Sequence, residues 1–454
     1  MSDLDAIFKA YDIRGTFPDQ IDAEACRAIG AAFARFALDE GGPVPEILVA
    51  RDMRPSGPEL VAAFSEGVRS QGVDVVDLGL ASTDLIYFAA GSREAPGAMF
   101  TASHNPAQYN GIKFCLAGAR PVGADTGLER IKELAATGVA AGGSTGGERS
   151  LDLLGQFADH VRSFVDTTAF RPLKVVADTA NGMGGLVVPA VFDALPFDLE
   201  ILYGELDGSF PNHPADPIQP ENQRDLCARV REVGADIGFA FDGDADRVFV
   251  VDERGEGLSG SVTTALVAVG VLEKEPGATV LHNLICSKVV PEVVREQGGT
   301  PVRTKVGHSY IKAEMANTGA AFGGEHSAHY YFRDNYRADS GLIAAMHVLE
   351  RLCATDEPMS VLRQPFDRYA DSGEINTQVD DPRAVIDAVA GAFAESDPDA
   401  AQDRLDGLTV DLGDWWFNLR PSNTEPLLRL NLEARTRDEC DDHTSELLHL
   451  ITKG

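Results

Sequence analysis

Short apolar segments alternate with longer amphipathic segments through most of the chain, and three stretches repeat one plan. Each stretch opens with an apolar strand that ends in polar turn residues, within 47–57, 174–185 and 279–288. A helical segment follows, with Ser56 as the candidate cap of the first, and then second strands at 73–80, 198–205 and 300–307. After another helical segment come third strands at 97–100, 236–241 and 320–324. Strands that alternate with helices predict three related α/β domains with mixed, mainly parallel sheets.

The last part of the chain, from about Pro365, has a different pattern. A strand at 373–379 and a helix at 382–396 precede consecutive strands at 408–412, 415–419 and 427–434, with a closing helix from Arg437. Consecutive strands favour an antiparallel sheet, so we expect a small α+β domain here. The glycine-rich segment 141–147 is typical of a flexible connector. We therefore predict four domains, at 1–147, 148–253, 254–365 and 366–454.

A polar loop follows the third strand of each α/β stretch. The first strand leads into "TASHNP" (101–106), the second into "DGDADR" (242–247) and the third into "EHSAHYYFRD" (325–334). Ligands of open α/β sheets bind beyond the carboxyl ends of the strands. We therefore expect the three loops to face a shared cleft.

The loop at 242–247 places Asp242, Asp244 and Asp246 at alternating positions. Three carboxylates this close repel one another unless a cation lies between them. Hard oxygen ligands favour Mg²⁺, which keeps positions for phosphate oxygens or water. We predict a divalent-cation site, with Arg247 as a donor fork for a phosphate or polar substrate group.

Two other interpretations of this loop stay open. In a calcium-binding loop Glu253 would occupy the twelfth position, although Arg247 stands where such a loop needs glycine and strand-like segments flank it. A solvated acidic turn without a cation is the second interpretation.

The loop at 101–106 places Ser103 at a strand end, beside His104. The same residues also make a good turn. A serine hydroxyl is a weak nucleophile without help from a base or a metal. The aspartate loop occupies the equivalent position of the next repeat and could provide such help, and Lys113 follows closely with a positive charge.

The segment 323–334 collects Glu325, His326, Ser327 and His329. A zinc site is one interpretation, but a thiolate and an HExxH spacing are both missing. We favour a clamp for sugar hydroxyls, because a carboxylate accepts from two neighbouring hydroxyls and a serine donates or accepts. A structural turn is the third interpretation.

Basic and polar residues also gather in "RPSNTEP" (420–426), a pattern that suits an anion. The residues concerned are Arg420, Ser422, Asn423 and Thr424. Two further segments, "KAYDIRG" (9–15) and "KVGHSYIK" (305–312), add Arg14 and His308.

These bases are informative because the chain as a whole is acidic. Its 454 residues carry a formal net charge of −32, from 71 acidic and 39 basic side chains. Such a surface repels nucleic acid and anionic membranes, so neither is expected as a partner. Adaptation to salt is another source of such an excess.

The cellular setting follows from what the sequence lacks. No segment approaches the run of about 20 apolar residues that spans a bilayer. The first residues include acids where a signal peptide has bases. The six cysteines are scattered without paired spacing, as in a reducing compartment. We expect a soluble cytoplasmic protein.

Taken in order from "KAYDIRG" to "RPSNTEP", these motifs resemble the α-D-phosphohexomutase superfamily, most closely its bacterial phosphomannomutase and phosphoglucomutase branch. The resemblance implies a heart-shaped molecule in which four domains surround one central cleft. It implies reversible phosphoryl transfer between the 1- and 6-positions of a hexose phosphate. Mannose phosphates, and glucose phosphates with them, would react through a phosphoserine and a hexose 1,6-bisphosphate.

The resemblance also implies roles for individual residues. Ser103 would carry the phosphoryl group, and Asp242, Asp244 and Asp246 would bind Mg²⁺ together with an oxygen of the phosphorylated serine. Glu325 and Ser327 would contact sugar hydroxyls. The non-reacting phosphate would be held by Arg420, Ser422, Asn423 and Thr424. The general acid and general base would be among the residues Arg14, His104, Lys113, Arg247, His308 and His329.

Three positions depart from the family's common motifs. His326 and Ala328 replace a methionine and a glycine of the sugar loop, and Ala245 stands where glycine is frequent. Asn423 favours the mannose/glucose branch over phosphoglucosamine mutase. The same motifs are also compatible with a metal-dependent sugar phosphatase or with a non-catalytic protein that binds a sugar phosphate or a cation. The expected partners are small hexose phosphates, and the expected state is a monomer or homodimer.

Overall fold

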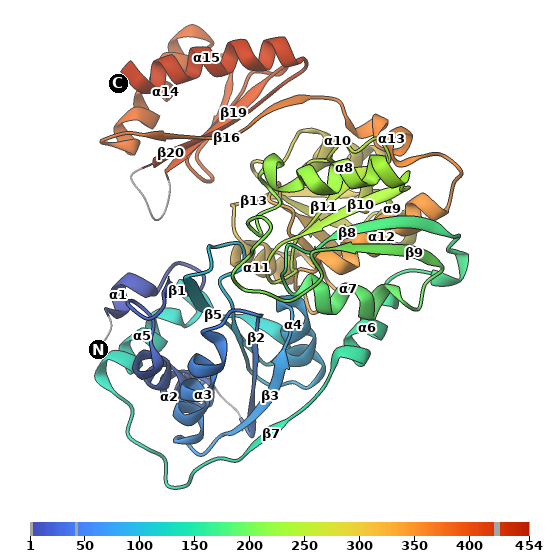
Figure 1. The fold of residues 1–454 in the computed structure, drawn as a ribbon. Coiled ribbons are helices and arrows are strands. Elements are labelled where there is room, and N and C mark those ends of the chain that lie inside the picture. Colours follow the sequence, from blue (N-terminus) through green and yellow to red (C-terminus); the bar gives the residue numbers. More distant parts are fainter. Residues whose placement is uncertain (1–2, 41–43, 422–426, 454) are drawn as a thin grey trace. The chain divides into compact units, whose positions relative to one another are not determined.

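The computed structural model describes residues 3–40, 44–421 and 427–453 (Figure 1). The chain forms two compact units, each considered by itself. The first comprises Met1–Ser259 and Ser327–Leu362, and the second comprises Gly260–His326 and Arg363–Gly454. The third α/β stretch is therefore divided between the two units.

The first sheet of the first unit has the order β1-β5-β4-β2-β3-β7. Its inner strands β2 (Glu46–Arg51), β3 (Asp74–Leu80) and β4 (Gly97–Phe100) pair in parallel, whereas β5 (Tyr109–Leu116) runs antiparallel to β4. The edge strands are β1 (Ile13–Thr16) and β7 (Glu148–Ser150). The carboxyl end of β4 leads directly into the serine loop.

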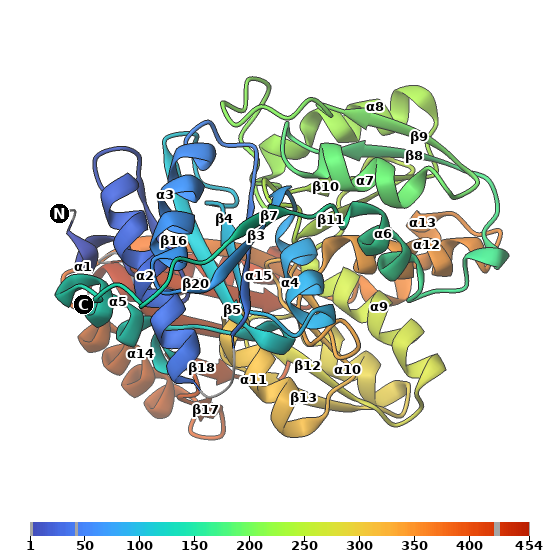
Figure 2. The ribbon, with the colours of Figure 1, turned by 90° about the horizontal axis from the view of Figure 1, so that it is seen from below.

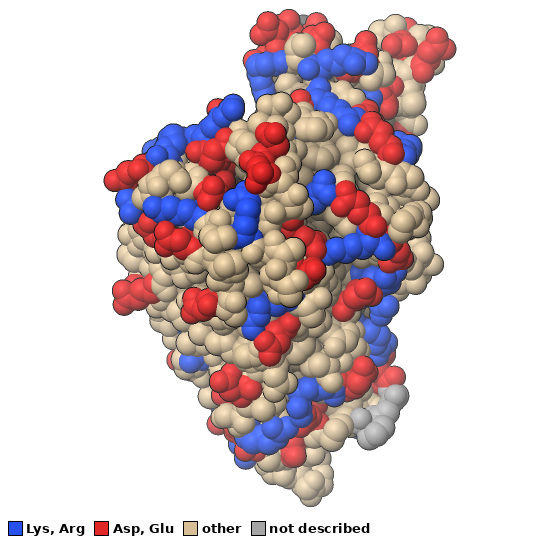
Figure 3. Space-filling model, turned by 90° about the vertical axis from the view of Figure 1, so that its right-hand side faces the viewer, with Lys and Arg blue, Asp and Glu red and all other residues tan. Residues whose placement is uncertain are grey.

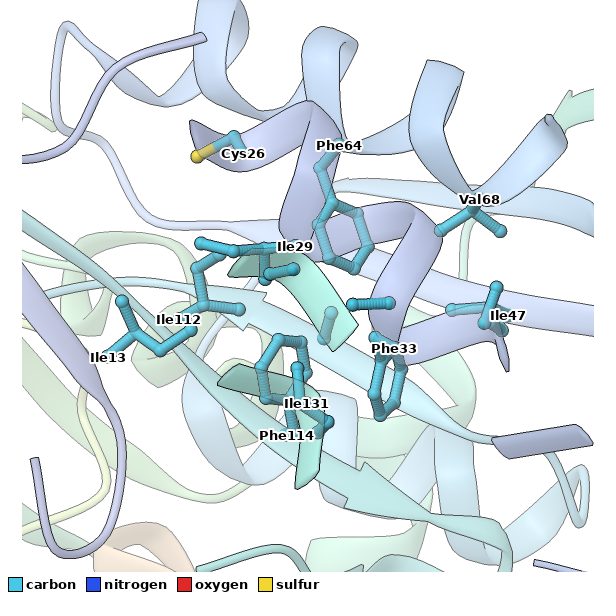
Figure 4. Packing of buried hydrophobic residues seen from close by; sticks show 14 of the residues in the cluster. Ile13, Cys26, Ile29, Phe33, Ile47, Phe64, Val68, Ile112, Phe114 and Ile131 are labelled. Atoms are coloured by element: carbon cyan, nitrogen blue, oxygen red, sulfur yellow. The ribbon is translucent and has the colours of Figure 1, made fainter. Parts of the chain in front are cut away.

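Helices α2 (Ala23–Asp39), α3 (Gly57–Arg69) and α5 (Leu128–Thr137) pack together over the core of this sheet (Figures 1 and 2). The aromatic rings of Phe33 and Phe114 stack there, with centroids 4.3 Å apart (Figure 4). Gly30 allows α2 and α3 to approach closely, because a Cβ at this position would lie 2.2 Å from the carbonyl oxygen of Phe64.

The second sheet of the first unit has the order β11-β10-β8-β9. Strands β8 (Leu173–Asp178), β9 (Phe197–Leu202) and β10 (Ile237–Phe241) are parallel. Strand β11 (Val248–Asp252) returns antiparallel to β10, so the aspartate loop is the turn of a hairpin. The helices that pack on this sheet are α7 (Gly184–Phe192), α8 (Arg224–Val233) and α12 (Gly341–Cys353), and α6 (Leu154–Arg162) packs against α7 and α12. Helix α4 (Thr83–Ser92) packs against β2, β4 and β5 of the first sheet.

The second unit contains a parallel group and an antiparallel sheet. Strand β12 (Thr279–Asn283) pairs in parallel with β13 (Thr300–Thr304) and β14 (Phe322–Gly324). The neighbouring helices are α9 (Gly260–Lys274), α10 (Val289–Glu296) and α11 (His308–Thr318). This part therefore supplies the first half of the predicted sugar loop, up to His326.

The antiparallel sheet has the order β16-β20-β19-β18-β17. Its strands are β16 (Ala370–Gln378), β17 (Ala401–Asp403), β18 (Leu408–Asp411), β19 (Trp416–Pro421) and β20 (Leu427–Ala434). Helices α14 (Pro382–Ser396) and α15 (Arg437–Lys453) cover one face of it (Figure 1). Arg420 lies near the end of β19, where the chain leaves the sheet.

The predicted fold class is confirmed: mainly parallel α/β layers are followed by an antiparallel α+β domain. Two local expectations were wrong. Ser56 precedes α3 but makes no capping hydrogen bond, and its Oγ instead accepts from Asn110 Nδ2 over 2.8 Å. The glycine-rich connector is also held in place, because Arg69 Nε donates to the Gly146 carbonyl over 2.9 Å.

The surface drawn in Figure 3 mixes acidic and basic side chains instead of separating them into patches. Among the described residues, no helix combines the length and the apolar character that a membrane crossing requires.

Candidate functional site

The aspartate loop is the best-defined cluster of functional groups in the first unit. Asp242, Asp244 and Asp246 are at most 1% exposed, and one oxygen from each lies within 4.8 Å of the others. Strands flank the loop, whereas a helix–loop–helix calcium site has helices there. The calcium interpretation is therefore wrong, and Glu253 instead accepts from the backbone N–H of Ser360 over 2.9 Å.

Several donors hold the three carboxylates in place. Lys113 Nζ donates to Asp244 Oδ2 over 2.8 Å and to Asp246 Oδ2 over 2.7 Å. Thr83, the first residue of α4, donates through Oγ1 to Asp244 Oδ2 over 2.6 Å. Arg247 Nε donates to Asp242 Oδ2 over 3.0 Å. A buried cluster of this kind is neither solvated nor unpaired, so the interpretation as a simple acidic turn is also wrong.

The carboxylates have different proton affinities. Burial raises the pKa of Asp242 to about 7, and the neighbouring Asp246 and Asp244 also raise it against the effect of Arg247. Burial also acts to raise the pKa of Asp244, but the charge and hydrogen bond of Lys113 dominate and hold it below its usual range. The same ion pairs outweigh the effect of burial on Lys113, whose pKa lies well above its usual range.

The donor set suits a hard divalent cation. Among the residues that the structure describes, Asp244 Oδ1 and Asp246 Oδ1 are buried oxygens without a hydrogen-bond partner. A buried carboxylate oxygen without a partner is costly, and a cation removes that cost. Three carboxylates with no nitrogen or sulfur ligand fit Mg²⁺. Asp242, Asp244 and Asp246 are therefore the residues that would hold it.

Ser103 faces this loop from the end of β4. Its Oγ donates to Asp242 Oδ2 over 2.8 Å, and the residue is 5% exposed. Its backbone has a φ of 47°, in the left-handed region that is unfavourable for serine. Gly243 lets the two loops touch, because a Cβ there would lie 2.4 Å from the Ser103 carbonyl oxygen.

A buried arginine fixes the backbone of the serine loop. Arg54 donates through Nη2 to the carbonyl oxygens of Ser103 and Asn105, and through Nη1 to those of Pro106 and Tyr109. Its Nε donates to Asp52 Oδ2 over 3.1 Å, and neither of these two side chains is exposed. All five N–H donors of the guanidinium are therefore used.

Three further predicted residues join the serine and aspartate loops. His104 Nδ1 lies 3.3 Å from Ser103 Oγ and 2.7 Å from Arg247 Nη2. Desolvation of the ring by the surrounding loops and then the charge of Arg247 keep the pKa of His104 well below its usual range, although the residue as a whole is exposed. Arg14 reaches the same loop by a hydrogen bond to the side chain of Asn105.

His329 approaches the aspartate loop from the other side. Its Nδ1 lies 2.9 Å from Asp339 Oδ2 and 3.9 Å from Asp246 Oδ1. Burial lowers the pKa of His329, but the hydrogen bond with Asp339 and the charge of Asp246 raise it above its usual value. Its side chain is 22% exposed, so the ring can still be reached from solvent.

In the second unit, Glu325 is 2% exposed and anchored through Oε1. This oxygen accepts from Asn283 Nδ2 over 3.1 Å and from Gly307 N over 3.0 Å. His308, the first residue of α11, follows Gly307 directly. Neighbouring His326 has Nδ1 3.0 Å from Ser261 Oγ, and burial lowers its pKa.

Arg420 is 5% exposed and donates to Asn431 Oδ1 over 2.7 Å and to Glu374. Burial lowers its pKa, and the charge of Glu374 opposes this effect. The other predicted phosphate-loop residues, Ser422, Asn423 and Thr424, lie outside the described residues. Ser327 is half-buried and belongs to the first unit.

The structure thus gathers eight predicted residues in one cluster of the first unit. They are Ser103, His104, Lys113, Asp242, Asp244, Asp246, Arg247 and His329. Sequence reasoning did not single out Arg54, Thr83 or Asp339. Arg54 carried a signal, because it lies in the polar turn after the first predicted strand, whereas Thr83 and Asp339 belong to no recognisable motif.

Comparison with known proteins covers nearly the whole chain. Models of the phosphoglucomutase/phosphomannomutase α/β/α domains I, II and III match residues 5–140, 155–256 and 259–369. The model of the C-terminal domain matches residues 374–449.

Individual relatives agree with these domain matches. The "phosphohexose mutases" protein of Xanthomonas campestris pv. campestris is 41% identical over 431 residues, which cover 94% of this chain and 95% of that protein. The phosphomannomutase of Escherichia coli (strain K12) is 39% identical, with 94% of each chain covered. A solved phosphoglucomutase/phosphomannomutase family protein from Burkholderia thailandensis has a TM-score of 0.90 at 35% identity, covering 100% of this chain and 99% of that one.

Proposed function

Because the chain belongs to the phosphoglucomutase/phosphomannomutase family and is a phosphohexomutase, we propose that Ser103 carries the transferred phosphoryl group. The substrates are mannose 1-phosphate and mannose 6-phosphate, and glucose phosphates react as well. The observation that carries this proposal is the 2.8 Å contact between Ser103 Oγ and Asp242 Oδ2, inside a buried cluster of carboxylates and cations.

Family members generally depend on Mg²⁺, and the three aspartates offer it oxygen ligands. The cation supplies charge neutralisation for the transferring phosphoryl group. Lys113 contributes a fixed positive charge beside the same carboxylates, and Arg247 contributes another at Asp242. Preorganised charges of this kind provide most of the catalysis in phosphoryl transfer.

His329 is our choice for the proton acceptor of the attacking sugar hydroxyl. His104 is poorly suited, because its Nδ1 already faces Arg247 Nη2 at 2.7 Å. Lys113 holds its proton too tightly, since two ion pairs raise its pKa. His329 is partly exposed, and Asp339 supports the charge that its ring gains on protonation.

The remaining roles concern the sugar phosphate. Glu325 and Ser327 contact sugar hydroxyls, and Arg420 holds the phosphate that does not react, with Ser422, Asn423 and Thr424. Ser103 first donates its phosphoryl group to the free hydroxyl, which gives a hexose 1,6-bisphosphate. The bisphosphate then turns round and returns its other phosphoryl group to Ser103, so the same binding groups serve both half-reactions.

The test measures both possible products. Mannose 1-phosphate or glucose 1-phosphate is incubated with Mg²⁺ and a catalytic amount of hexose 1,6-bisphosphate, and sugar 6-phosphate and free phosphate are quantified. Ser103→Ala is compared with Ser163→Ala, which changes an exposed serine that donates only to a helix carbonyl. We expect isomerised sugar from the wild type and from Ser163→Ala alone. Free phosphate as the main product would identify a phosphatase, and full turnover by Ser103→Ala would refute the assignment of Ser103.

A further inference from the structure

A second group of possible metal ligands adjoins the three-aspartate loop. Asp246, His329 and Asp339 each present one ligand atom, and these atoms lie within 4.8 Å of one another. His329 Nδ1 is 2.9 Å from Asp339 Oδ2 and 3.9 Å from Asp246 Oδ1. A tetrahedral Zn²⁺ with bonds of about 2.0–2.1 Å separates its ligand atoms by about 3.3 Å. The two distances from His329 Nδ1, 2.9 and 3.9 Å, lie on either side of this value.

The ligand types distinguish this group from the Mg²⁺ site. The three-aspartate loop offers oxygen alone, whereas this group adds an imidazole nitrogen, which Zn²⁺ prefers and Mg²⁺ does not. Two carboxylates and one histidine leave the fourth tetrahedral position for water. We propose that Asp246, His329 and Asp339 form a separate Zn²⁺ site, and that Zn²⁺ bound there inhibits the enzyme.

A buried atom on the His329 side of Asp246 is consistent with a cation at this position. Asp246 is 1% exposed, and its Oδ1 has no hydrogen-bond partner among the residues that the structure describes. Its Oδ2 is already held by Lys113 at 2.7 Å. One carboxylate thus has one oxygen fixed on the side of Lys113 and the other directed toward His329. The same Oδ1 is the oxygen that Asp246 offers to the Mg²⁺ loop, so the two sites share this atom, and titration in saturating Mg²⁺ tests whether both can be filled.

The backbone around the group is well fixed. His329 pairs with Arg247 in an antiparallel bridge, which ties its segment to the aspartate loop. Gly341, two residues after Asp339, packs against the same arginine, since a Cβ there would lie 2.7 Å from the Arg247 carbonyl carbon. Ser340 caps α12 by accepting from Ile343 N over 3.2 Å. Such anchoring lowers the cost of organising the ligands, and the 22% exposure of the His329 side chain leaves a route for the ion.

Binding and inhibition are separate parts of the proposal. Binding rests on the geometry alone. Inhibition rests on the proposed function of His329: a neutral imidazole has one lone pair, and a metal on Nδ1 uses it, so Nε2 keeps its proton. The ring then cannot accept a proton from a sugar hydroxyl.

The binding test is calorimetric titration of Zn²⁺ into the full chain saturated with Mg²⁺. We expect one site for the wild type. Asp339→Asn and His329→Gln should each bind at least tenfold more weakly, because each loses a ligand. Asp242→Asn is the matched control, since Asp242 belongs only to the Mg²⁺ loop, and it should bind Zn²⁺ as the wild type does. Circular dichroism and melting curves establish that each variant is folded.

Three results would overturn the site. These are loss of Zn²⁺ binding when Mg²⁺ saturates, wild-type affinity in both folded variants, or loss of binding in Asp242→Asn alone. Each would place zinc at the Mg²⁺ loop or nowhere in this cluster. The inhibition test is mutase turnover in saturating Mg²⁺ with and without Zn²⁺, reversed by a chelator. If Zn²⁺ binds as expected but turnover is unchanged, His329 is not the proton acceptor and the inhibition is refuted. The Zn²⁺ site itself would still stand.

Discussion

Ser103 Oγ and Asp242 Oδ2 lie 2.8 Å apart, so a phosphoryl group on the serine places two anions in direct proximity. Arg247 also contacts Asp242, at 3.0 Å, but one guanidinium cannot neutralise both groups. The phosphorylated protein should therefore depend on a divalent cation for stability more than the unmodified protein does.

This dependence gives the first prediction. Mg²⁺ should raise the melting temperature of the phosphorylated protein clearly more than that of Ser103→Ala, because ligands that bind only the folded state stabilise it. Intact-mass analysis establishes the phosphorylation state, and scanning calorimetry with Mg²⁺ or chelator measures the shift. Equal shifts in the two proteins would contradict the proposed proximity of phosphate and metal.

The second prediction concerns Asp244. Asp244→Asn removes one anionic ligand and also weakens the ion pair with Lys113. Turnover at low Mg²⁺ should fall steeply, with a partial recovery at high Mg²⁺. A Mg²⁺ titration of turnover measures this, and Asp225→Asn, at an acid in α8 that hydrogen-bonds to Tyr203, is the control. Activity that survives thorough chelation would exclude the aspartate loop as a catalytic metal site.

The third prediction tests the buried arginine. Arg54→Met leaves the Asp52 carboxylate buried without its partner and removes the donors to four carbonyl groups. Loss of one member of a buried ion pair costs about 3–5 kcal/mol in the free energy of unfolding. Arg51→Met changes a neighbouring, half-buried arginine and should cost much less. Denaturant unfolding measures the free energy of unfolding of both variants. Equal losses of this free energy would refute a special role for Arg54.

The fourth prediction compares two arginines that share one acid. Both Arg420 and Arg429 contact Glu374, but only Arg420 is buried and assigned to substrate phosphate. Arg420→Ala should weaken substrate binding by roughly 2–5 kcal/mol, which raises KM from about 30-fold to several thousandfold. Arg429→Ala should change KM little. Similar KM values for the two variants would contradict the assignment.

The fifth prediction concerns the choice of sugar. Mannose and glucose differ only at C2, and Glu325 suits hydroxyls that both sugars share, so kcat/KM should differ by less than about a thousandfold. His326 is the first residue to test if discrimination is stronger, because Ser261 fixes its ring at 3.0 Å. His326→Met restores the common family residue. If the wild type strongly prefers one sugar and His326→Met reduces that preference in kcat/KM, His326 determines the sugar specificity. An unchanged preference would exclude this role for His326.

The sequence predicted the parts of the site that follow regular strands. Ser103 and the three aspartates could be found because each loop directly succeeds an apolar segment that ends a predicted strand. The helix predicted at 382–396 is also present, and it begins at Pro382 after the cap residue Asp381.

Residues whose role depends on distant partners could not be found in this way. Arg54 acts on carbonyl groups that lie 49–55 positions further along the chain. Its position in a polar turn did not reveal these partners. Thr83 meets Asp244 across 161 positions, and no local pattern marks Thr83. The fixed glycine-rich connector escaped prediction for the same reason, because its partner Arg69 is 77 positions away.

The four carbonyl contacts of Arg54 have a consequence for how this loop can vary. A guanidinium that binds main-chain oxygens does not depend on which side chains the loop displays. Substitutions at the displayed positions can therefore alter the chemistry of the loop and keep its shape. For protein engineering, the side chains of the serine loop can therefore be replaced while its backbone conformation is kept, provided that Arg54 and Asp52 are retained.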